Sequence, residues 1–337
     1  RWEEPMEPIP TSNIPYTPTA IEVNMGHIAG QDYAKRALLI AAAGNHNVLM
    51  HGPPGSGKTL LARATAGILP PPTFEEMIDI TRIYSVAGLL PSTTPLLTNR
   101  PFRSPHHSAS AAALVGGGAS VRPGEITLAH RGVLFLDEMV EFNRDVLESL
   151  REPLETGAIT ISRAAGSLRF PAKFMLIAAC NPCPCGYLGD PERRCTCMPG
   201  AVAKYRRKLS GPIQDRIDLH VEVPRLKFDK LTAEAVAEPS EPIRLRIEQA
   251  RQLERQRFHG LGYLTNSEMP PQDIKKFCAV DEQTRDLLRN AVDRQHLSAR
   301  AYHRVLKLSR TIADLASAER IEQNHVAEAL NYRPKAD

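Results

Sequence analysis

Ten residues near the start of the chain, His51 to Leu60, read HGPPGSGKTL and match the pattern of Gly, four residues, Gly-Lys-Thr. In such a loop the glycines let backbone N–H groups turn inward around a phosphate, at dihedral angles that a β-carbon hinders. The lysine then reaches the β and γ phosphates, and the threonine hydroxyl binds Mg²⁺. The pattern predicts a binding site for ATP and Mg²⁺. Its predicted nucleotide-binding residues are Gly52, Pro53, Pro54, Gly55, Ser56, Gly57, Lys58, Thr59 and Leu60.

The flanking residues argue against a chance match. An apolar run, Asn47 to Met50, comes directly before the loop, and a helical pattern from Lys58 to Ile68 follows it, with Leu60 on its predicted buried side. The amino end of that helix would point its positive dipole at the phosphates. Further upstream, Ile28 and Gln31 lie in a predicted turn that could contact the adenine base. A predicted helix, which Asp32 could cap, follows this turn.

A second motif, GVLFLDEM, runs from Gly132 to Met139. Its four apolar residues, Val133 to Leu136, predict a strand buried on both faces of a parallel sheet. Ligands of such sheets bind at the carboxyl ends of the strands, where this chain has Asp137 and Glu138. We expect Asp137 to hold Mg²⁺ through water and Glu138 to orient and deprotonate the attacking water.

Three further candidate site residues lie at or near the ends of predicted helices and strands. Asn181 follows an apolar strand, Phe174 to Ala179, where its amide could sense the γ phosphate. Arg216 lies in LSGPIQDRIDLHVEV, between a helix and a short strand. Arg300 lies in the first turn of a helix that Ser298 caps.

Six cysteines are present, and four fall in one window from residue 183 to residue 197. They form two Cys-x-Cys pairs, which could close a tetrahedral thiolate site around Zn²⁺ or remain free thiols in a reducing cytosol. Cys180 and Cys278 lie in apolar patterns and are predicted to be core residues. The candidate zinc ligands are Cys183, Cys185, Cys195 and Cys197.

Length and composition predict two globular domains. The chain has 337 residues, of which 42% are hydrophobic and 24% charged. No apolar run approaches the ~18 residues of a membrane span, so we expect no membrane partner. Residues 1–20 carry five prolines and read as a linker, residues 21–224 as an α/β nucleotide-binding domain, and residues 225–337 as a helical lid. A net charge of +4 is too mild to require nucleic acid.

Two segments predict β-hairpins added to the α/β domain. One falls between residues 115 and 128, after the motif RPFRSPHHSAS, whose adjacent histidines suggest an interface or a phosphate contact. The other is Gly157 to Ala172, with Arg163 and Arg169 near its tip. A single helix, Asn143 to Glu155, is predicted between them.

These motifs together resemble the AAA+ ATPases of the magnesium-chelatase-like branch, and within it the ComM (YifB) family of bacterial competence proteins. The resemblance runs from about Gly26 to Arg333 and rests on RPFRSPHHSAS, GEITLAHRGVLFLDE, LSGPIQDRIDL and LSARAYHRVLKLSRTIADL. It implies a P-loop core with a parallel sheet between helices and β-hairpin inserts, followed by a helical lid. Family members also carry an N-terminal Lon-protease-like domain, which is absent from this sequence.

The resemblance implies a role for each matching residue. Asn181 corresponds to sensor 1, Arg216 to the arginine finger that reaches the γ phosphate of a neighbouring subunit, and Arg300 to the sensor 2 arginine. Lys58 and Thr59 would bind ATP with Mg²⁺. The two hairpins would line the pore of a hexameric ring.

The implied function is an ATP-driven ring motor that migrates DNA branch points during natural transformation and recombination, in the bacterial cytoplasm. Its partners would be single- and double-stranded DNA, copies of itself and recombination proteins. The alternative is a chelatase-type subunit that drives metal insertion through a partner protein. A ring that binds nucleotide without turnover is disfavoured by the intact catalytic set, and Arg163 and Arg169 favour DNA over the chelatase reading.

Overall fold

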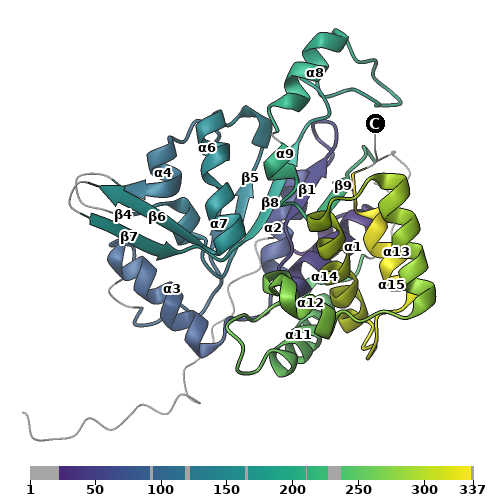
Figure 1. The fold of residues 1–337 in the computed structure, drawn as a ribbon. Helices are drawn as coiled ribbons and strands as arrows, with labels where there is room; N and C mark the ends of the chain where they lie inside the picture. Colours follow the sequence, from purple (N-terminus) through teal and green to yellow (C-terminus); the bar gives the residue numbers. More distant parts are fainter. Residues whose placement is uncertain are drawn as a thin grey trace, which may run out of the picture.

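A computed structural model describes residues 23–91, 94–117, 122–163, 166–209, 211–226 and 237–334. The predicted linker, residues 1–20, lies outside these ranges. The described chain forms an α/β domain, with a group of C-terminal helices packed beside it (Figure 1). No helix in these ranges is long and apolar enough to cross a membrane.

The α/β domain is built on a five-stranded sheet whose order is β2-β5-β8-β1-β9, with parallel neighbours throughout. The predicted parallel sheet is therefore confirmed. Its strands are short, and those in the middle of the sheet are largely apolar and buried, as expected for strands covered on both faces. The strands are β1 (Val48–His51), β2 (Phe102–Arg103), β5 (Val133–Leu136), β8 (Met175–Cys180) and β9 (Leu219–Glu222).

Alternate side chains of the strands enter two different cores. Met50, Phe135 and Ile177 pack into a core that contains helices α1 (Asp32–Gly44) and α2 (Lys58–Ile68). Their strand neighbours, such as Leu49 and Leu134, pack into a second core on the opposite face. The second core includes residues of α4 (Ala111–Val115), α5 (Glu125–Leu128), α6 (Arg144–Ser149), α8 (Pro199–Arg207) and α9 (Gly211–Gln214).

Two details of these helices differ from expectation. Asp32 does not cap α1, because Gln31 is the cap residue, in a left-handed conformation with φ 57°. Helix α2 has the predicted bounds, but Leu60 is 42% exposed rather than buried. Its position at the first turn places it beside the phosphate loop instead of over the core, where Leu61 and Ala64 lie.

The C-terminal part of the chain is helical, so the predicted helical lid is confirmed as a helical region. Ser298 caps α14 by accepting a hydrogen bond from the Ala301 N–H at 3.2 Å. Val305 and Ile312 on the same helix join the core shared with α1. These helices are α11 (Ser240–Arg257), α12 (Pro271–Phe277), α13 (Glu282–Gln295), α14 (Ala299–Leu315) and α15 (Gln323–Asn331).

A network of charged side chains joins the lid helices α11 and α14 and contacts the α/β domain through Arg251, and we call Arg251, Glu254, Arg257, Arg310 and Asp314 the junction network. Asp314 accepts hydrogen bonds from Arg257 at 2.8 Å and from Arg310 at 3.1 Å. Arg251 donates to the Ala42 carbonyl of α1 at 2.9 Å. Burial raises the pKa of Glu254 to about 8 and lowers that of Arg251, so both groups are pushed toward their neutral forms.

The first predicted hairpin is confirmed only in part. Only β3 (Gly116–Gly117) and β4 (Arg122–Pro123) pair, and residues 118–121 lie outside the described ranges. The following residues form helix α5, whose consecutive Ile126, Thr127 and Leu128 are all buried. A strand with one solvated face cannot bury three residues in a row, so the pattern is that of a short core helix.

The second predicted hairpin is confirmed. Strands β6 (Ala158–Arg163) and β7 (Gly166–Pro171) pair antiparallel, with Ile161 opposite Leu168, and extend from the domain on the side away from the lid (Figure 1). The helix before them is split into α6 and α7 (Arg151–Thr156). Pro153 explains the break, because a proline ring clashes with the carbonyl four residues earlier.

The remaining elements connect these parts. Helix α3 (Phe74–Val86) begins with a capping box in which Thr73 and Glu76 satisfy each other's backbone N–H groups. Short 3₁₀ turns are η2 (Met25–His27), η3 (Met139–Glu141) and η4 (Asn266–Glu268).

Candidate functional site

Three neighbouring strands carry the predicted motifs to one edge of the sheet. Strand β8 lies between β1 and β5, with Cys180 opposite His51 and Ala178 opposite Leu136. Because all three run in the same direction, the residues that follow them meet at the carboxyl edge. We call Lys58, Thr59, Asp137, Glu138 and Asn181 the nucleotide edge.

Lys58 lies inside the phosphate loop. Its ammonium group donates to the carbonyls of Gly52 at 2.8 Å and Pro53 at 2.9 Å, and lies 3.4 Å from Oδ1 of Asn181. Burial lowers the pKa of Lys58, while the nearby carboxylates oppose that shift. Lys58 and Asn181, the sensor 1 candidate, therefore lie next to each other at the phosphate loop.

Glycine is required at the start of the loop for a steric reason. A β-carbon at Gly52 would stand 2.1 Å from the carbonyl oxygen of Val223, at the end of β9. Gly57, the last loop glycine, has φ +93°. The remaining loop positions, Pro53, Pro54, Gly55 and Ser56, lie between these two residues, directly after β1.

Thr59 and Asp137 meet as the sequence predicts. The Thr59 hydroxyl donates to Oδ2 of Asp137 at 2.7 Å. A hydroxyl and a carboxylate are hard oxygen ligands, the type that Mg²⁺ prefers, so this pair fits a magnesium site.

Glu138 is held in an unusual backbone conformation, with φ 49° and ψ 46°. Few residues other than glycine and asparagine adopt this left-handed region. The Glu138 N–H donates to Oδ1 of Asp137 at 3.0 Å. The Glu138 side chain is 54% exposed. Nδ1 of His107 lies 3.7 Å from the Glu138 carboxylate, a contact with the predicted base that the sequence did not indicate.

The turn at Ile28 and Gln31, predicted to contact adenine, lies against the phosphate loop. The Gln31 side chain donates to the Ser56 carbonyl at 3.3 Å and to the Pro224 carbonyl at 2.7 Å. Ile28 is buried beneath this turn. The turn thus ties the loop to the segment that follows β9.

Arg216 and Arg300 come together, but at a different place. Both bind the carboxylate of Glu155, Arg216 through a hydrogen bond and Arg300 at 3.2 Å. The hydrogen bond from Arg216 lowers the pKa of Glu155. Within the described ranges, the hydrogen bonds and ion pairs of these two arginines do not reach the nucleotide edge. Glu155 lies at the end of α7, and no sequence signal marked it.

The four cysteines of the window form one cluster, with all four sulfurs within 4.8 Å of one another. Cys183 lies 3.4 Å from Cys185 and 3.7 Å from Cys195, and Cys185 lies 3.6 Å from Cys195. A tetrahedron of sulfurs ~2.3 Å from a zinc ion has edges of about 3.8 Å. The spacing and the soft sulfur donors both fit one Zn²⁺.

The other two cysteines are core residues, as predicted. Cys278 is buried in the lid. The Cys180 sulfur lies 2.9 Å from Nδ1 of His51, and burial raises the pKa of this thiol to about 12 while lowering that of His51 to about 4. Both groups are therefore neutral at physiological pH.

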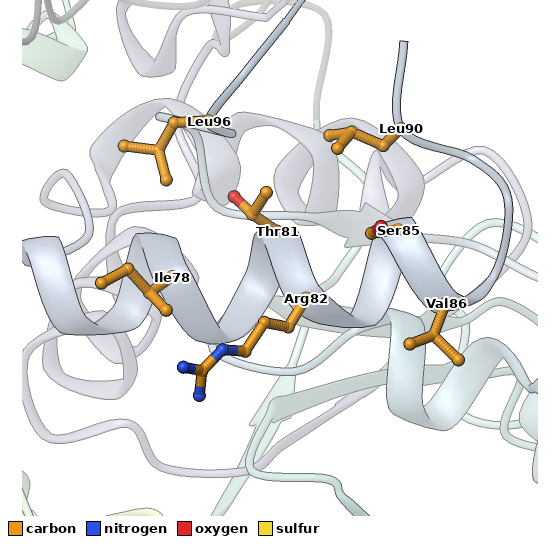
Figure 2. Close-up of a pocket in the computed structure, with 7 residues that line it drawn as sticks. All are labelled: Ile78, Thr81, Arg82, Ser85, Val86, Leu90 and Leu96. Atoms are coloured by element: carbon orange, nitrogen blue, oxygen red, sulfur yellow. The ribbon is translucent and has the colours of Figure 1, made fainter. Parts of the chain in front are cut away.

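Two other surface features lie apart from the nucleotide edge. Arg169 is exposed on β7, and Arg163 ends β6 across the hairpin. A shallow hollow beside α3 is shown in Figure 2, and none of the nucleotide-edge residues line it. Its lining residues are Ile78, Thr81, Arg82, Ser85, Val86, Leu90 and Leu96.

The parallel sheet, the phosphate loop and the acidic pair define a P-loop nucleotide hydrolase of the AAA+ class. Two family profiles cover most of this chain: magnesium chelatase subunit ChlI over residues 24–231 and its C-terminal part over residues 237–333. The chain belongs to the magnesium chelatase subunit ChlI family.

Curated relatives support the resemblance to the ComM (YifB) group. Identity is 45% over 322 residues to "Competence protein ComM" of Haemophilus influenzae, and 42% over 315 residues to "Uncharacterized protein YifB" of Escherichia coli. These matches cover 92% and 93% of this chain but only 60% and 61% of the relatives. A more distant relative, "Magnesium-chelatase 67 kDa subunit" of Chlorobaculum parvum, is 29% identical over 159 residues, or 46% of this chain and 23% of that protein.

Proposed function

We propose that this chain is the ATP-hydrolysing part of a hexameric ring motor that acts on DNA and migrates branch points in natural transformation and recombination. The observation that carries the hydrolysis step is the nucleotide edge, where Lys58, the Thr59–Asp137 pair and Glu138 meet beyond the carboxyl ends of β1 and β5. ATP bound there would supply the phosphoryl group. Lys58 would bind its phosphates, and Glu138 would take the proton of the attacking water.

The two arginines support an assembly of several subunits. Arg216 is only 9% exposed and is paired with Glu155, at a position separate from the nucleotide edge of its own chain. An arginine finger acts on the nucleotide of a neighbouring subunit, so a separate position suits Arg216 to that role. Arg300 shares the same carboxylate and would act beside it.

The hairpin β6–β7 supports the choice of DNA as substrate. A two-stranded ribbon that extends from the domain can place guanidinium groups against successive phosphates, and Arg169 is exposed on it. The identity to a protein named for competence agrees with a role in transformation. Single- and double-stranded DNA, further copies of this chain and recombination proteins are the proposed partners, and such a role belongs to the cytoplasm.

The decisive experiment is the ATPase rate with and without single-stranded DNA, on protein whose oligomeric state has been measured. We expect DNA to stimulate turnover in the ring. A rate that DNA leaves unchanged, in a sample that forms rings, would contradict the motor.

A double variant tests the hairpin directly. Arg163→Ala with Arg169→Ala should lower DNA affinity equally across sequences and reduce the salt slope by roughly one unit per lost phosphate contact. The control is Arg289→Ala on α13, far along the chain, at a side chain that is 67% exposed. Equal DNA binding by the double variant and the parent at every salt concentration would remove the hairpin from the DNA site.

The second candidate is a chelatase-type subunit that drives metal insertion through a partner protein. It is favoured by the two ChlI profiles and by the match to a magnesium-chelatase subunit. The same ATPase experiment separates the two functions, because a chelatase subunit has no reason to respond to DNA.

We also propose that the cysteine cluster holds one Zn²⁺ per chain. Support comes from the four sulfurs at tetrahedral spacing. Metal analysis of protein purified without added zinc tests this. Less than about a tenth of an equivalent, with four titratable thiols, would leave the cysteines as free thiols.

A further inference from the structure

The cysteine cluster touches the phosphate loop. Gly186, next to Cys185, has φ +84°, and a β-carbon there would stand 2.5 Å from Cδ of Pro54. The Gly186 N–H donates to the Cys183 carbonyl at 2.9 Å, which closes a turn inside the cluster. The loop predicted to wrap the phosphates therefore rests on the turn that carries two of the four sulfurs.

A second connection runs through Asn181. This residue comes two positions before Cys183, which is fully buried, and its Oδ1 lies 3.4 Å from Nζ of Lys58. A displacement of the Cys183–Cys185 turn would therefore move the sensor 1 candidate as well as the loop.

The other two sulfurs come from the far end of the same segment, just before α8. The Cys185 N–H points to the Cys197 sulfur at 3.3 Å, and the Cys197 N–H points to the Cys195 sulfur at 3.4 Å. N–H groups directed at sulfur are the contacts that orient thiolate ligands around a metal. An ion bound here would cross-link the two ends of the segment and restrict the conformations open to it.

We propose that Zn²⁺ bound by the four cysteines holds the phosphate loop in its nucleotide-binding shape, so that zinc and nucleotide bind this chain cooperatively. The inference rests on the proposed function, since it needs both a nucleotide in the loop and a metal in the cluster. By linkage, each ligand strengthens the binding of the other by the same factor. Couplings between two sites in one protein are typically about 5- to 150-fold.

The first experiment removes and restores the metal in the full 337-residue chain. ADP affinity, in excess Mg²⁺, is measured by calorimetry on the zinc-loaded protein, after a zinc-selective chelator, and after one equivalent of Zn²⁺ is returned. We expect the affinity to fall at least about fivefold on removal and to recover on return. An unchanged affinity in zinc-free protein, or a chain that takes up no zinc, would overturn the proposal.

The reciprocal measurement guards against simple unfolding. Zinc affinity is determined by competition with a chelator of known affinity, with and without saturating ADP. The same factor should appear in both directions, because linkage requires it. A zinc affinity that ADP leaves unchanged would contradict the coupling.

Two glycines in the segment provide a matched pair of variants. Gly186 and Gly189 both have left-handed φ, +84° and +80°, but no atom lies within 4 Å of a β-carbon at Gly189. Gly186→Ala should weaken ADP binding while zinc remains near one equivalent, and Gly189→Ala should leave ADP affinity at the parent value. Equal losses of ADP affinity in the two variants would show that backbone strain causes the effect. They would overturn the proposal that the contact between Gly186 and Pro54 transmits it.

Failure of this inference is distinguishable from failure of the proposed function. A zinc-loaded parent that binds no ADP refutes the nucleotide site itself. A parent that binds ADP with an affinity independent of zinc refutes only the coupling.

Discussion

The nucleotide edge and the junction network are both clusters of charged side chains, but they differ in how far their carboxylates are exposed to solvent. At the nucleotide edge, the Glu138 side chain is 54% exposed, whereas the Asp314 side chain in the junction network is 1% exposed. Asp314 is bound by two arginines and an asparagine amide, so its capacity to accept hydrogen bonds is used within the chain. An exposed carboxylate remains available for a metal and water, whereas removing a buried one leaves its partner charges buried and unpaired.

Substitutions at the nucleotide edge should remove function and leave stability nearly intact. We predict that Lys58→Ala abolishes ATP binding, because Lys58 is the cation inside the phosphate loop. Glu138→Gln should keep binding and lower turnover by about 10²- to 10⁴-fold, since it removes the base. Calorimetry and a phosphate-release assay measure the two effects. Equal losses of nucleotide affinity in both variants would contradict this division of roles.

Arg216 combines features of both regions, since it is buried and paired like the junction network but is predicted to act in catalysis. Arg216→Ala should lower turnover by ~10³ or more. Mixing it with Lys58→Ala subunits should restore part of the activity if rings form, because each subunit supplies what the other lacks. No recovery in rings shown to be mixed would make Arg216 a structural residue.

In the junction network, substitution should remove stability first. Asp314→Ala leaves Arg257 and Arg310 without their carboxylate and should lower the free energy of unfolding by about 3–5 kcal/mol. The control is Asp286→Ala, whose partner Arg289 is 67% exposed, with an expected change within about 0.5 kcal/mol. Chemical denaturation measures both, and similar losses would erase the contrast between buried and exposed pairs.

Glu254 should make stability depend on pH in one direction. Its pKa is raised from 4.5 to about 8, so the folded chain holds a proton in that window that the unfolded chain has released. Stability should therefore fall as pH rises from about 4.5 to 8, with a slope of up to about 1.4 kcal/mol per pH unit. Glu254→Gln should flatten that slope in denaturant unfolding at a series of pH values. An equally steep slope in the variant would assign it to other groups.

The parts that could be predicted from sequence are those set by neighbouring residues. The bounds of α2, the end of β5 just before Asp137 and the hairpin β6–β7 follow from local spacing and alternation. The first hairpin was predicted to extend too far, because the short apolar run at Glu125–Leu128 fits a strand or a core helix and only the packing around it decides.

Contacts between distant segments that carry no motif could not be predicted. Glu155 meets Arg216 and Arg300 from 61 and 145 positions away, and Gly186 meets Pro54 across the sheet edge. Each of these pairs depends on how whole elements pack, and no single-sequence pattern encodes that. The buried state of Glu254 was missed for the same reason.

The left-handed backbone at Glu138 has a consequence for protein engineering. A non-glycine residue in this region carries a strain of order 1–3 kcal/mol, and glycine or asparagine would relieve part of it. A library selected for heat resistance alone would therefore enrich replacements at position 138 that discard the carboxylate. Any thermostabilised version of this chain must be selected with turnover as a second criterion, because one available gain in stability lies on the residue assigned to hydrolysis.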